Sequence, residues 1–202
     1  MVKEVHHRVK NNFQIVASLL ELQTKDIEDE KALSLANEGK QRVKSMALIH
    51  QKLYQNDSGL INFEEYTQLL VKELTALYAS DKNVITTVNA QNTMLDVDTA
   101  IPLGLIINEL ITNAYKYAFQ ENKENKLNIL IQKSQGNMYK LTVNDNGSGL
   151  DNSVDLRKIK SLGLRLVRRL TKQLHGTLTQ INNNGAHFEI VFKDTNARKS
   201  VL

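Results

Sequence analysis

The chain of 202 residues contains no cysteine, so it can form neither a disulfide bond nor a thiolate metal site. Redox chemistry at sulfur is therefore excluded, and the composition suits a reducing cytoplasm. The chain also lacks an apolar run of about 18 residues, which is the length that spans a bilayer. Its first residues lack the apolar core of a signal peptide. We expect a soluble, cytoplasmic chain that makes no membrane contact.

A strong excess of one charge is also missing, because 26 basic residues face 22 acidic ones and the net charge is only +4. No long block or stripe of like charge is present, so we expect no nucleic-acid partner. Internal repeats and low-complexity segments are absent as well. Apolar residues make up 41% and charged residues 24%, which is ordinary for folded proteins of one or two domains.

The apolar residues of the N-terminal part recur every three or four positions, which predicts two amphipathic helices, at 2–23 and about 29–54. A breaker cluster at 56–59 ends the second helix. Two long helices joined by a short turn form a hairpin, which exposes an apolar seam that it cannot cover alone. The sequence therefore predicts a dimerisation domain at 1–58 that forms a four-helix bundle in a homodimer.

The pattern after Gly59 alternates between helices and strands. We expect helices at 63–78, 99–119 and 161–175, with Pro102 tolerated in the first turn of the second of these. Strands are expected as a pair at 84–88 and 93–97, then at 127–133 and 139–143, and as a closing hairpin at 177–181 and 187–192. The predicted fold class is α+β, with the helical hairpin followed by an α/β sandwich at 60–195.

Three polar residues of the helix predicted at 99–119 cluster opposite its apolar stripe, namely Glu109, Asn113 and Lys116. Hard oxygen donors four residues apart can coordinate Mg²⁺ directly or through water, and a nearby lysine can meet the phosphates that the metal bridges. The same spacing also fits an ordinary solvated polar face. Taken alone, this motif favours the solvated face, because most such faces are only solvated.

Two glycine-bearing segments follow. Asp145, Gly147 and Gly149 come directly after a predicted strand, where a carboxylate can accept the exocyclic amine of adenine. A type I′ turn between two strands would use similar residues. Farther on, Ser161 and Gly163 open a helix whose backbone N–H groups attract phosphate, although Ser161 could also be an ordinary N-cap.

Taken in order, the segments N-E-L-I-T-N-A-Y-K-Y, D-N-G-S-G-L, S-L-G-L-R-L-V and G-A-H-F-E-I-V-F resemble the N, G1 and G2 boxes of the ATPase fold shared by histidine kinases and gyrase. The resemblance covers about 102–192. It implies that Asn113 holds Mg²⁺ and that Asp145 binds adenine. The nucleotide-binding loops would be shaped by Gly147, Gly149 and Gly163.

One further correspondence and two departures refine the resemblance. Glu109 stands where gyrase-type enzymes carry their catalytic glutamate. The segment 150–160 would be a short ATP lid, and no phenylalanine-rich F box precedes Ser161.

The first helix carries H-H-R-V-K-N-N-F, which resembles the dimerisation box H-R-x-x-N of the histidine-kinase subfamily related to the HWE kinases. His7 fits this box through Arg8 and Asn11, whereas His6 does not. A helical wheel places His7 opposite the apolar stripe, so we expect it to face solvent as a phosphoacceptor must. Arg8 stands where many histidine kinases carry an acidic residue. Glu4 could replace that residue or simply pair with Arg8.

The resemblance implies the core of a sensor histidine kinase, which uses ATP and Mg²⁺ to phosphorylate His7 and passes the phosphoryl group to the receiver domain of a response regulator. A non-catalytic phosphotransfer protein is a second reading, but the complete nucleotide boxes argue against it. An anti-sigma-type serine kinase is a third, and the histidine box argues against that. Because this box begins near residue 1, we expect a fragment that lacks an N-terminal sensory region.

Overall fold

The computed structural model describes residues 2–24, 27–53, 60–78, 82–121, 123–134, 137–149, 161–182 and 184–194. Within the first two helices, only the backbone is described for residues 2–11, 14, 31 and 49–53. The expected solvent-facing orientation of His7 and the role of Glu4 therefore lie outside the described side chains. The breaker cluster at 56–59 and the short lid at 150–160 lie outside the described residues altogether.

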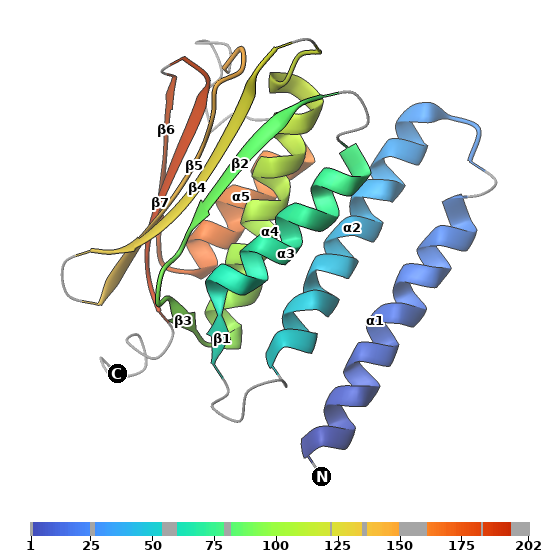
Figure 1. Cartoon of the computed structure of the whole chain (residues 1–202). Helices are drawn as coiled ribbons and strands as arrows, with labels where there is room; N and C mark the ends of the chain where they lie inside the picture. The colour runs from blue at the N-terminus through green and yellow to red at the C-terminus, as the bar shows by residue number, and fades with distance from the viewer. Residues whose placement is uncertain are drawn as a thin grey trace.

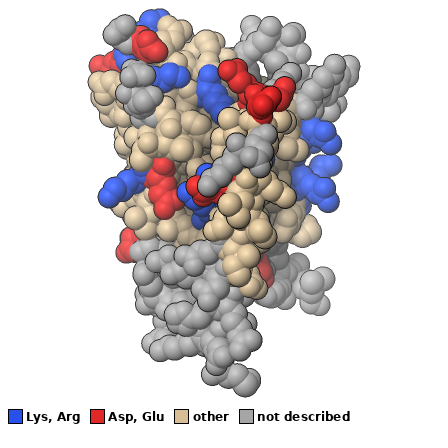
Figure 2. All heavy atoms as spheres, turned by 90° about the vertical axis from the view of Figure 1, so that its right-hand side faces the viewer, with Lys and Arg blue, Asp and Glu red and all other residues tan. Residues whose placement is uncertain are grey.

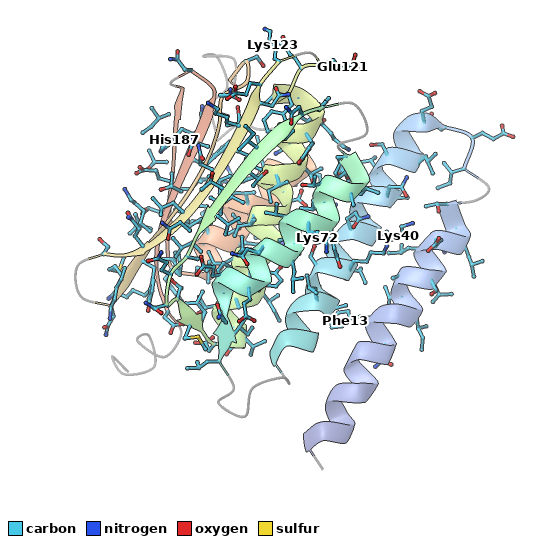
Figure 3. The ribbon with its side chains drawn as sticks, viewed as in Figure 1. Phe13, Lys40, Lys72, Glu121, Lys123 and His187 are labelled. Carbon is cyan, nitrogen blue, oxygen red and sulfur yellow. The ribbon has the colours of Figure 1, made fainter. Side chains whose placement is uncertain are left out.

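The N-terminal part is a helical hairpin, as the apolar spacing predicted. It consists of α1 (Val2–Thr24) and α2 (Glu30–Leu53). Asp29 precedes α2, and its carboxylate accepts a hydrogen bond of 2.6 Å from the Ala32 N–H, which satisfies a free donor of the first turn. Lys40 extends from α2 toward α1 (Figure 3), where it pairs with Glu21 at 3.9 Å. In Figure 1, α1 is the outermost helix and α2 lies between it and the rest of the molecule.

A five-stranded mixed sheet forms the other side of the molecule. Its strands, in spatial order, are β2 (Val84–Asn89), β4 (Asn125–Lys133), β5 (Met138–Asp145), β7 (Ala186–Lys193) and β6 (Thr177–Asn182). The β2–β4 pair is parallel and the other pairs are antiparallel. The predicted closing hairpin is confirmed as β6 and β7, and the sheet of the predicted sandwich is mixed.

The strands expected at 84–88 and 93–97 do not pair with each other. Instead, β3 (Met94–Leu95) pairs with β1 (Ile61–Asn62) in a separate two-stranded sheet. The reason is a turn at 90–93, where the Thr93 N–H bonds to the Ala90 carbonyl at 3.0 Å and Asn92 has a φ of 57°. This turn directs the chain away from β2.

Three helices cover one face of the sheet (Figure 1), namely α3 (Phe63–Tyr78), α4 (Val97–Asn113) and α5 (Leu162–Gln173). The apolar residues on alternate positions of the strands face these helices and are buried, as are Leu127, Ile129 and Ile131 of β4. The mixed α+β architecture, a helical hairpin before an α/β sandwich, is thus confirmed.

The central helix differs from its prediction at both ends. It begins at Val97 after the N-cap Asp96, whose carboxylate accepts from the Thr99 N–H at 2.9 Å. Because of this earlier start, Pro102 lies in the second turn and not in the first. At the other end the helix changes into a π-helix, η1 (Ala114–Ala118), a widening that is rare and often accompanies functional sites.

Candidate functional site

Two polar residues in the C-terminal half of α4 are buried. Glu109 is only 4% exposed and its neighbour Asn108 only 2%, because α2 and α5 both pack against α4. The reading of this surface as an ordinary solvated face is therefore wrong. A carboxylate buried to this degree requires a partner of opposite charge.

That partner is Arg42 of α2. Its Nε donates to Glu109 Oε1 at 2.7 Å and its Nη2 donates to Oε2 at 2.7 Å, so the contact engages both carboxylate oxygens. Arg42 Nη2 also donates to Glu38 at 3.2 Å, one turn earlier on α2. Hydrogen bonding to Glu109 raises the pKa of the Arg42 guanidinium, against the opposing effect of burial. A guanidinium that engages a carboxylate in this two-pronged manner fixes its orientation as well as its charge.

Lys116 lies in η1, about two turns beyond Glu109 on the same side, and it also reaches α2. Its Nζ donates to Glu38 at 2.6 Å and to the Ser34 hydroxyl at 3.1 Å. Two of the three polar residues predicted for a metal and phosphate site are thus bonded to the same helix of the hairpin.

The start of α5 approaches the same place. A Cβ atom added to Gly163 would lie 2.6 Å from Glu109 Oε2 and 3.9 Å from Asn113 Oδ1. The structure therefore brings these three predicted residues together, and the absence of a side chain at Gly163 lets the Glu109 carboxylate approach α5 closely. Ser161 stands at the N-cap position, but its side chain makes no capping hydrogen bond. The N–H groups of the first turn of α5 are those that would meet phosphate.

Asp145 ends β5 at the other side of this region. Its Oδ1 accepts two hydrogen bonds, from the N–H of Gly147 at 2.9 Å and from that of Ala186 at 3.2 Å. Burial raises the pKa of Asp145, and these two hydrogen bonds partly counter the effect. A two-residue turn is followed at once by a second strand, but residues 146–149 are all outside a strand. The alternative of a two-residue turn between strands is therefore wrong.

Glycine is required at several points around Asp145. A Cβ on Gly147 would overlap Ala118 of η1, and Gly149 has a φ of 72°. Gly185, which sequence reasoning did not select, has a φ of 134°, and its Cβ would overlap the main chain of Asp145. The sequence signal that could have found Gly185 was its position at the start of the last glycine-bearing segment, G-A-H-F-E-I-V-F.

Sequence reasoning also missed Arg42 and Glu38. The only signal was their i,i+4 spacing on a predicted helix, which usually marks a weak surface pair. Because α2 was assigned to a separate domain, nothing in the sequence placed them beside Glu109.

The residues present fit Mg²⁺ held together with a polyphosphate. Within the described part of the chain, no three His, Asp or Glu side chains are grouped as a complete protein metal site. Mg²⁺ does not require one, because it keeps several waters and takes one or two protein oxygens beside the phosphate oxygens. The Asn113 amide oxygen suits this role. Since Arg42 bonds both oxygens of Glu109, this carboxylate would reach a metal through water.

Comparison with known proteins identifies two regions. Residues 4–78 match a family described as histidine kinase, and residues 98–196 match the histidine kinase-, DNA gyrase B- and HSP90-like ATPase family. Sensor histidine kinase PdtaS of Mycolicibacterium smegmatis is 30% identical over 200 residues, which are 98% of this chain and 40% of that protein. Blue-light-activated histidine kinase 2 of Erythrobacter litoralis is 27% identical over 87% of this chain and 51% of its own length. The chain thus spans about half or less of these relatives.

A solved structure shares the fold. The histidine kinase domain of the Erythrobacter litoralis EL346 blue-light-activated histidine kinase superposes with a TM-score of 0.73 at 23% identity, covering 99% of this chain and 96% of that one. Among the described residues, no helix has the length and apolar character needed to cross a membrane.

Proposed function

We propose that this chain, which belongs to the histidine kinases and forms one of their catalytic cores, binds Mg·ATP between α4, η1 and the start of α5 and phosphorylates its own His7. The phosphoryl group then passes to an aspartate of a response-regulator receiver domain. The observation that carries the proposal is the convergence of Glu109, Asn113 and Gly163 at one point, directly beneath the hairpin helix α2.

Each residue of the site has a distinct task. Asp145 accepts the adenine amine through Oδ2, since its Oδ1 already holds two backbone N–H groups. Asn113 holds Mg²⁺, which when bound neutralises charge on the β- and γ-phosphates. The first turn of α5 and Lys116 bind phosphate oxygens, and Lys116 must exchange Glu38 for phosphate to do so.

The reaction itself is an in-line displacement. A lone pair of the neutral His7 imidazole forms the N–P bond while the bond from the γ-phosphorus to the bridging oxygen breaks, and ADP leaves. We assign to Glu109 the task of orienting the imidazole and of offsetting the positive charge that develops on it. Arg8 follows His7 in place of an acidic residue, which leaves this task to a carboxylate elsewhere.

Incubation of the purified chain with γ-³²P-ATP tests the proposal. We expect label on the protein that is stable to alkali and lost in acid, because phosphohistidine is acid-labile. Acid-stable label would instead support a serine kinase. Absence of label, with ATP bound, would support a phosphotransfer protein that does not catalyse its own phosphorylation.

The surface of the hairpin supports a homodimer. Ile15, Leu19 and Leu22 of α1 are each more than half exposed although they are large and apolar, and so is Leu35 of α2. Figure 2 views this side of the molecule and shows a broad uncharged surface between scattered charged side chains. An apolar stripe of this kind on a two-helix hairpin is normally covered by a second hairpin.

We therefore expect a dimer in sedimentation velocity at tens of micromolar, and a monomer after the double substitution Leu19→Glu and Leu22→Glu, because two buried carboxylates per chain would oppose association. Ile181→Glu, on the edge strand β6, is a matched control and should leave the dimer intact. A wild-type monomer at these concentrations would contradict the bundle.

A further inference from the structure

The strongest contact between the hairpin and the nucleotide site is the pair formed by Arg42 and Glu109. Both side chains are largely buried, with exposed fractions of 14% and 6%. The two hydrogen bonds of 2.7 Å hold both carboxylate oxygens against the guanidinium. The carboxylate can therefore rotate only if both bonds are broken.

Little else on α4 orients this carboxylate. Asn108 Nδ2 approaches Glu109 Oε1 at only 3.5 Å, the limit of a hydrogen bond. The Asn108 Oδ1 atom is itself buried and has no hydrogen-bond partner. The direction of Glu109 is thus set by a residue of α2, 67 positions away in the sequence, and not by its own helix.

The Glu109 carboxylate held in this way points toward the start of α5. Glu109 Oε2 faces Gly163 at the start of α5, where no side chain intervenes. This oxygen therefore lies beside the first turn of α5, the segment proposed to bind the phosphates.

Glu38 extends the contact to a second site residue. It bonds Arg42 at 3.2 Å and Lys116 at 2.6 Å. Lys116 must exchange Glu38 for phosphate when the nucleotide binds, and Glu38 then retains Arg42 as its partner. The Arg42–Glu109 pair would remain in place, because breaking it would leave a buried charge uncompensated.

We propose that Arg42 is a positioning residue of the phosphotransfer site, which holds the Glu109 carboxylate aimed at the reacting groups, so that the site is complete only while α2 of the hairpin is docked. This inference rests on the proposed function. It assigns the hairpin two contributions, the acceptor histidine on α1 and the arginine on α2 that prepares the carboxylate to meet it.

The test uses the whole chain and measures two quantities, the affinity for Mg·ATP by calorimetry and the maximal rate of acid-labile ³²P incorporation at saturating ATP. Arg42→Gln should lower the maximal rate by about 100-fold, as loss of a preorganised charged contact does. Its affinity should change by no more than about threefold, since Arg42 contacts no nucleotide. Arg42→Lys should recover only part of the rate, because an ammonium group cannot hold both oxygens.

Two comparisons separate positioning from general destabilisation. Lys44→Gln makes the same charge change on an exposed residue of α2 and should keep the full rate. The double variant Arg42→Gln with Glu109→Gln should be no slower than Glu109→Gln alone, because Arg42 acts through that carboxylate.

Several results would overturn the inference. A rate for Arg42→Gln equal to wild type would remove Arg42 from the site, and a faster rate would show that the pair restrains the kinase. Additive losses in the double variant would show that Arg42 acts independently of Glu109. If Arg42→Gln does not fold, Arg42→Lys decides, and a folded Arg42→Lys at full rate refutes the two-pronged requirement. Failure of the wild-type chain to gain acid-labile label would instead refute the proposed function.

Discussion

Substitution of His7 by glutamine is expected to abolish acid-labile ³²P incorporation while the affinity for Mg·ATP persists. The amide keeps some of the polarity of the imidazole but cannot form a phosphoramidate. The nucleotide residues lie on α4, η1, β5, the loop that follows β5, and α5, and none of them belongs to α1. Labelling followed by acid treatment measures the first effect and calorimetry the second.

His6 provides the matched control, because it is the same residue type one position earlier and a helix turns about 100° between them. His6→Gln should retain labelling, at a reduced rate if His6 contributes to orientation or to bundle packing. Label lost in His6→Gln but kept in His7→Gln would move the acceptor by one residue and break the match to Asn11. Label that survives in the double variant would refute a histidine acceptor at this position and favour the serine-kinase reading.

Asp145→Asn should weaken Mg·ATP binding by about 10- to 100-fold, which corresponds to the loss of a charged hydrogen bond of about 1.5–3 kcal/mol. Asparagine can keep both backbone hydrogen bonds through Oδ1, from Gly147 and Ala186, so the loop should hold its shape. It would then present Nδ2 in place of Oδ2, and a donor would face the donating amine of adenine.

Calorimetric titration of the folded variant measures this loss. Asp98→Asn, the same change at an exposed position in the first turn of α4, should bind Mg·ATP as the wild type does. The Asp145 variant should also remain a dimer, since the apolar stripe proposed for the interface lies on α1 and α2. An unchanged affinity in Asp145→Asn would remove this carboxylate from the adenine site.

The sequence by itself determined the elements whose signals are local. Apolar spacing of three and four residues placed α1, α2 and α3 within one residue of their observed ends, because a helix is built from contacts between near neighbours. It also selected Asp145, Gly147 and Gly163, since each lies in a short contiguous segment where a strand ends or a helix begins.

Only the tertiary structure decided how those segments meet. The wheel of α4 predicted a solvent-facing polar side, but docking of α2 and α5 buried Glu109 and joined it to Arg42. Likewise, the parallel pairing of β2 with β4 and the antiparallel pairing of β3 with β1 depended on how the chain turned between them. Contacts between residues far apart in the chain leave no periodicity in either segment. The sequence therefore shows which residues are charged, and only the tertiary structure shows which of them pair.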